Sequence, residues 1–125
     1  MLKLLMLISG WIEVLFGAWA LVAPLSVIEM AGGKGGGVQT PTLALVSLLG
    51  AATLGLGVGA LIGRNHLETQ GGLAAAYGLG TYNIVGGVIL VLFSAWGTEG
   101  AGLWPGAILH AVIGSLFVYA FLARR

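Results

Sequence analysis

Three polar residues stand inside otherwise apolar runs of this chain, and their side chains are the ones that could carry chemistry. Glu13 lies in the middle of GWIEVLFGAW, residues 10–19, while Asn83 and His110 lie in two later apolar runs. A charged side chain at the centre of a lipid bilayer costs about 2.5 to 3.5 kcal/mol on insertion scales, and an ionisable residue there is by default a candidate functional site. These three residues therefore form the candidate site.

Counting residues along the apolar runs predicts that the three side chains share one depth. If the first run enters a bilayer near Leu4, Glu13 lies about nine residues in, or roughly 13 Å at about 1.5 Å per residue. Asn83 lies about eleven residues into its run from the same side, and His110 lies about six residues into its run from the other side. We expect four further side chains in the same interior: Ser9, Thr53, Tyr77 and Tyr82.

The role of Glu13 has three interpretations. A protonated Glu13 could donate a hydrogen bond to Asn83 or to a backbone carbonyl, which would make it a structural clasp. An ionised Glu13 could pair with a protonated His110, which would make the pair a site that responds to protons or a ligand. Glu13 could also lie in a contact between subunits.

The sequence lacks the residues that metal and nucleophilic chemistry require. A metal site needs at least three converging ligands, and Glu13 with His110 supplies only two. The chain contains no cysteine and no aspartate, so it offers neither a thiolate nor a catalytic triad. The glycines around Lys34 do not form a phosphate-binding loop, because that motif requires Lys followed by Ser or Thr. We expect no enzymatic activity, no metal and no cofactor, and a flexible connector over residues 26–42.

Composition identifies the kind of protein that must position these residues. Hydrophobic residues make up 58% of the chain and charged residues 7%, whereas a soluble domain is about one quarter charged. A chain this apolar is expected to be an integral membrane protein, with the lipid bilayer as its surroundings. Its net charge of +1, without a basic patch, argues against nucleic acid as a partner.

Four apolar segments are long enough to cross a membrane, since a helix needs about 20 residues to span roughly 30 Å. The sequence predicts an all-α fold, a single domain over residues 1–125, in which four transmembrane helices form a bundle. The expected spans are 4–23, 42–62, 72–95 and 104–122.

The basic residues predict the orientation of this bundle. Lys3, Arg64, Arg124 and Arg125 fall on one side, and only Lys34 falls on the other. Because cytoplasmic loops carry the excess of Lys and Arg, both termini are expected in the cytoplasm. We expect the membrane to be the bacterial cytoplasmic (inner) membrane.

Small residues recur every fourth position in three of the expected helices. Such strips let helix backbones approach closely, and packing drives helix association in lipid. Some strips are expected to contact other membrane subunits or a second copy of the chain. The residues expected in helix packing are Gly55, Gly59, Gly63, Gly80 and Gly114.

Two families resemble the chain. A first helix ending in APLSVIEMAGG, a glycine-rich second helix closed by Arg64 and a last helix WPGAILHAVIGSLFVYAFLARR resemble the small four-helix membrane proteins of the DoxX-like superfamily. This resemblance spans the whole chain. It implies a membrane bundle without assured catalytic residues, sometimes a companion subunit of redox or transport complexes.

The second resemblance covers the first helix alone. ISGWIEVLFGAW is similar to the first helix of small multidrug resistance transporters, in which one embedded Glu exchanges protons for a cationic or guanidinium substrate. Only Glu13 carries over to that role, because the chain is longer and its third helix lacks the family's Ala-Tyr-Ala-x-Trp pattern. The chain is thus expected to be an accessory or structural subunit, with a small proton-coupled transporter as the alternative.

Overall fold

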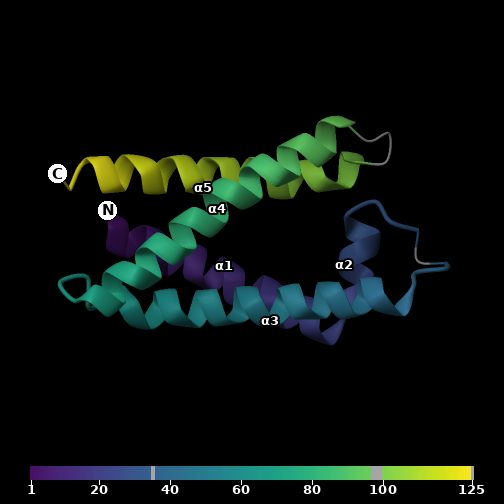
Figure 1. The fold of residues 1–125 in the computed structure, drawn as a ribbon, viewed down its shortest axis with the longest axis horizontal. Helices are drawn as coiled ribbons and strands as arrows, with labels where there is room; N and C mark the ends of the chain where they lie inside the picture. The colour runs from purple at the N-terminus through teal and green to yellow at the C-terminus, as the bar shows by residue number, and fades with distance from the viewer. Residues whose placement is uncertain (35, 97–99, 125) are drawn as a thin grey trace.

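The computed structural model describes residues 1–34, 36–96 and 100–124, and the regular structure in this part of the chain is all helical, with no strand (Figure 1). Four helices are long and apolar enough to cross a membrane. The predicted all-α bundle of four apolar helices is therefore confirmed, and each observed helix lies within about two residues of its predicted span. The elements are α1 (Leu2–Val22), α2 (Pro24–Met30), α3 (Thr40–Gly63), α4 (Gln70–Trp96), the 3-10 helix η1 (Gly100–Leu103) and α5 (Trp104–Leu122).

The short helix α2 was not predicted, because residues 26–42 were expected to be a flexible connector. Pro24 occupies the first position of α2, where its fixed φ favours the helix and its missing N–H costs nothing. Two hydrogen bonds hold α2 to the end of α1. The Trp19 Nε1 donates to Ser26 Oγ at 2.7 Å, and that hydroxyl donates to the Ala23 carbonyl at 2.7 Å. The connector therefore begins after α2.

The long helices form two closely packed pairs, α1 with α3 and α4 with α5 (Figure 1). Helix α4 begins beside the C-terminal end of α3 and runs diagonally across the bundle to α5. The two termini lie at the same end of the bundle. An apolar core fills that end, where the side chains of Met6, Leu79 and Phe117 are fully buried.

Four glycines bring the backbones of α1 and α3 into direct contact. Gly17 faces Gly50, and Gly10 faces Gly57, as expected for two antiparallel helices. A Cβ atom on Gly17 would lie 2.6 Å from the Gly50 carbonyl oxygen, and a Cβ on Gly57 would lie 2.6 Å from the Gly10 carbonyl oxygen. No side chain larger than hydrogen fits these positions without moving the helices apart, so the α1–α3 contact depends on glycine.

The glycines expected in helix packing divide into two groups. Gly63 approaches Ala75, Gly80 approaches Phe121 and Gly114 approaches Ile84, all between helices. Gly55 and Gly59 have no atom within 4 Å of the position of a Cβ. These two glycines therefore do not pack against the described part of their own chain, and their expected role in helix packing stays a prediction.

The geometry of the helix explains the difference between the two groups. At about 100° per residue, positions 55 and 59 lie far around the helix from Gly57, which is the glycine that contacts α1.

Candidate functional site

A hydrogen-bonded network joins α1, α4 and α5 through the side chain of Asn83. The Asn83 Nδ2 donates to the Leu79 carbonyl at 2.9 Å and to Ser9 Oγ at 3.3 Å. The Asn83 Oδ1 lies 3.0 Å from His110 Nδ1. Ser9 and Asn83 are fully buried. The network therefore connects the two helix pairs inside the bundle.

The partners of Asn83 determine which nitrogen of His110 carries the proton. The Leu79 carbonyl can only accept, so the amide Nδ2 must point toward it and the Oδ1 must point toward His110. Because Oδ1 also only accepts, His110 Nδ1 must donate. In the neutral ring the other nitrogen, Nε2, is then an acceptor with a free lone pair.

Glu13 lies one turn along α1 from Ser9, and its side chain is only 3% exposed. Within residues 1–34, 36–96 and 100–124, its carboxyl group makes no hydrogen bond to Asn83, to His110 or to a backbone carbonyl. Among the described residues, neither the clasp bond nor the ion pair considered from the sequence is present. The Glu13 carboxyl does lie close enough to Tyr82 for the two groups to interact electrostatically.

The remaining predicted side chains lie in three different places. Tyr82 packs edge to face on His110, with ring centroids 5.3 Å apart. Thr53 is buried where α3 meets Gly17 of α1, and its hydroxyl donates to the Gly50 carbonyl of its own helix at 3.1 Å. Tyr77 is 55% exposed and stacks on Phe121, with centroids 4.4 Å apart. The prediction that Tyr77 joins the interior is wrong.

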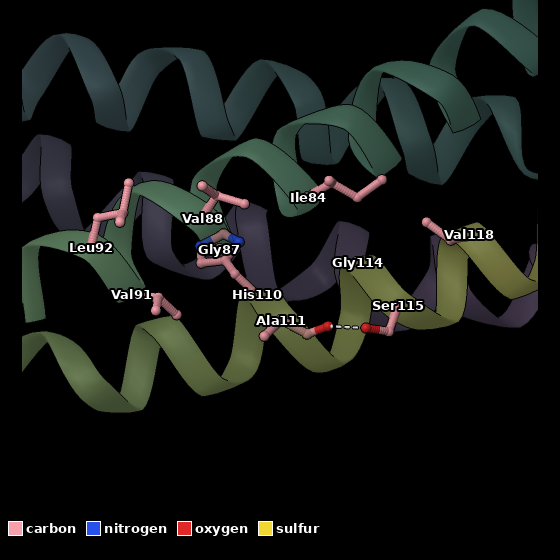
Figure 2. Close-up of a pocket in the computed structure, with 10 residues that line it drawn as sticks. All are labelled: Ile84, Gly87, Val88, Val91, Leu92, His110, Ala111, Gly114, Ser115 and Val118. Carbon is pink, nitrogen blue, oxygen red and sulfur yellow. Dashed lines mark hydrogen bonds between the residues drawn. The ribbon is translucent and has the colours of Figure 1, made fainter. Parts of the chain in front are cut away.

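A groove between α4 and α5 is a feature that sequence reasoning missed. It has a volume of about 350 Å³, and the His110 ring forms part of its wall (Figure 2). The Ser115 hydroxyl donates to the Ala111 carbonyl at 2.8 Å. Apart from His110 and Ser115, the residues that line the groove are apolar: Ile84, Gly87, Val88, Val91, Leu92, Ala111, Gly114 and Val118.

The groove exists because two small residues bring α4 and α5 close beneath it. Gly87 approaches the backbone of Ala111, and Gly114 approaches that of Ile84. The spacing of small residues in the last helix was the signal that could have indicated the groove. The positions of the glycines alone do not show which neighbouring side chains line a groove.

No family model, curated protein or solved structure matches the chain. The resemblances to the DoxX-like superfamily and to small multidrug resistance transporters therefore stay predictions.

The described residues limit the chemistry that this site can perform. Among them, no three His, Cys, Asp or Glu side chains converge in a way that could hold a metal ion. What the interior offers is a buried carboxyl group without a hydrogen bond, an amide that fixes a histidine, and a histidine nitrogen able to accept a hydrogen bond. Such groups can bind a proton or a hydrogen-bond donor.

Proposed function

We propose that this protein is an accessory or structural subunit that packs laterally against a helix of a larger complex in the bacterial cytoplasmic membrane. In this proposal it has no catalytic activity, and both termini face the cytoplasm. The observation that carries the proposal is the uncovered face of α3, where Gly55 and Gly59 have no atom within 4 Å of a Cβ position.

An uncovered glycine face is suited to contact with another helix in the membrane. Lipid tails are as apolar as leucine, so helices associate in membranes where small residues let their backbones approach. Helix α3 has one glycine face that is packed and one that is uncovered. The packed face contacts α1 through Gly50 and Gly57. The exposed Ala51 and Ala52 extend the uncovered face by about one turn toward the start of α3. We define Ala51, Ala52, Gly55 and Gly59 as the open α3 face.

Purification in mild detergent from the native membrane tests this proposal. The wild-type chain should elute with a larger membrane partner in a fixed ratio that mass spectrometry identifies. Gly59→Leu should lose that partner, because the new side chain adds bulk to the open α3 face at a position where its Cβ meets no described atom within 4 Å.

The matched control is Ala18→Leu, which adds bulk at an exposed position of α1. This variant should keep the partner. Wild-type protein that elutes only as a single chain or as copies of itself contradicts the proposal.

A second function, a small proton-coupled transporter, is favoured by the state of Glu13. Its side chain is buried, and its carboxyl group makes no hydrogen bond in the described part of the chain. A carboxyl group held in this way is free to bind a proton or a cation. Transport further requires that water reach Glu13 from each side in turn.

Liposomes that contain the purified protein distinguish the two functions. A transporter should take up guanidinium when a proton gradient is applied, and Glu13→Gln should abolish uptake because it removes the exchangeable proton. Ser9→Ala, one turn away, leaves the carboxyl group in place and should retain uptake. Wild-type liposomes that take up no more guanidinium than empty ones exclude the transporter.

A further inference from the structure

The groove between α4 and α5 is not used by the proposed packing of α3. Its volume of about 350 Å³ falls near the lower end of the range of small-molecule sites, about 300–1,000 Å³. Its rim is formed by exposed aliphatic side chains, among them Val88, Leu92 and Val118. In a membrane these side chains face the hydrocarbon region, so a ligand would reach the groove from the bilayer.

The ring of His110, which lines this groove, has a free hydrogen-bond acceptor. Its Nδ1–H is directed to Asn83 Oδ1, and Asn83 is itself held by the Leu79 carbonyl. Ring rotation would break that bond, so Nε2 stays the acceptor.

The Nε2 atom is also not fully enclosed. Among the described residues, Ser94 Oγ is the one fully enclosed side-chain polar atom without a partner. The Nε2 of His110, which also has no partner, therefore keeps some accessible surface. The ring lies between the groove-lining side chains of both helices (Figure 2).

The second polar group that lines the groove, the hydroxyl of Ser115, is also a hydrogen-bond acceptor for a ligand. The Ser115 hydroxyl gives its hydrogen to the Ala111 carbonyl, so its oxygen can only accept from a ligand. Two acceptors in an apolar wall favour a ligand that donates. A ligand with only acceptors, such as an ether or an ester, would leave both groups unsatisfied.

We propose that the α4–α5 groove binds a membrane-dissolved amphiphile that carries a hydroxyl group on an apolar body. The hydroxyl donates to His110 Nε2, and the apolar body lies along the aliphatic side chains of the groove. Phenols and long-chain alcohols have this chemistry. Asn83 acts as the positioning residue, because it fixes the histidine form that can accept.

The test uses two probes that differ only in the donor, 4-nonylphenol and its methyl ether. The protein is labelled with nitrogen-15 at histidine and placed in phosphatidylcholine nanodiscs. The chain has two histidines, and His66 lies outside the helices, so it serves as the internal reference. The phenol should shift the His110 Nε2 resonance in a saturable way and leave His66 unchanged.

The methyl ether should bind about two- to tenfold more weakly, which corresponds to one lost hydrogen bond, and should cause no such shift. Val88→Trp should abolish the phenol shift, because Val88 lines the groove and is 57% exposed, so the new ring fills the groove without entering the core. Val112→Trp, at a position of α5 that is 53% exposed and does not line the groove, should leave the shift intact. An absent shift, an equal shift with both probes, or an unchanged response in Val88→Trp overturns the proposal.

Discussion

Replacing Gly57 by alanine should weaken the fold, and the structure indicates by how much. A Cβ on Gly57 would lie 2.6 Å from the Gly10 carbonyl oxygen, whereas ordinary contacts begin at 3.4 Å. The difference, 3.4 − 2.6, means that α1 and α3 must separate by about 0.8 Å at this point. Overpacking of this kind costs about 1–3 kcal/mol.

The matched control is Gly55→Ala, two residues away on the same helix. Its Cβ meets no described atom within 4 Å. Both variants replace a helical glycine by alanine, so both gain the same intrinsic helix preference, about 1 kcal/mol. The difference between the two variants therefore isolates the overlap with α1. Gly57→Ala should unfold with a free energy about 1–3 kcal/mol smaller than that of Gly55→Ala.

Reversible unfolding by sodium dodecyl sulfate in mixed micelles measures this difference, with tryptophan fluorescence as the signal. The measurement needs only the isolated protein, so it does not depend on any partner or ligand. Equal unfolding free energies for the two variants would refute the account of the α1–α3 contact. A less stable Gly55→Ala would refute it as well.

Three further predictions concern the interior, the exposed stack and the orientation. A double-mutant cycle with Asn83→Ala and His110→Ala, measured by the same unfolding assay, should give a coupling of about 0.6–1.7 kcal/mol, as for other hydrogen bonds inside membrane proteins; additive effects would contradict the network. Tyr77→Ala should lower the free energy of unfolding, because it removes the stack on Phe121, which contributes about 0.5–1.5 kcal/mol in addition to the loss of buried area. The His110 resonances should not move in this variant, and a shift would place Tyr77 in the interior. A reporter fused to the C-terminus should be active in the cytoplasm, and activity only in the periplasm would reverse the proposed orientation.

The four long helices and their lengths could be predicted because the lengths of the apolar runs set them. Long apolar runs interrupted by polar residues leave few alternatives to spanning helices. The shared depth of Asn83 and His110 could also be predicted, since counting residues at a fixed rise gives the depth of each side chain. The hydrogen bond between them was not predicted, because each was expected to pair with Glu13.

The faces of the helices could not be predicted in the same way. In a soluble helix the buried face is the apolar one, but a helix in lipid is apolar all round and carries no such pattern. Helix α3 adds a second difficulty, because Gly55, Gly57 and Gly59 place small residues on opposite faces. Which of these glycines packs inside the chain depends on the position of α1.

Tyr77 shows how depth and face must be considered together. It lies six residues before Asn83 on α4, which at about 100° per residue turns it far from the direction of Asn83. The rise along the helix also moves it by roughly 9 Å toward the helix start. It therefore reaches Phe121 near the end of the bundle that holds the termini.

The central claim is that the open α3 face contacts another membrane protein. Its most direct test is photo-crosslinking in intact native membranes, with benzoylphenylalanine placed at position 55 and, separately, at position 18 on the exposed side of α1. The account predicts one discrete adduct with an identifiable larger protein from position 55 and none from position 18. Adducts only with lipid or with a second copy of the chain at position 55, or the same adduct from both positions, would contradict it.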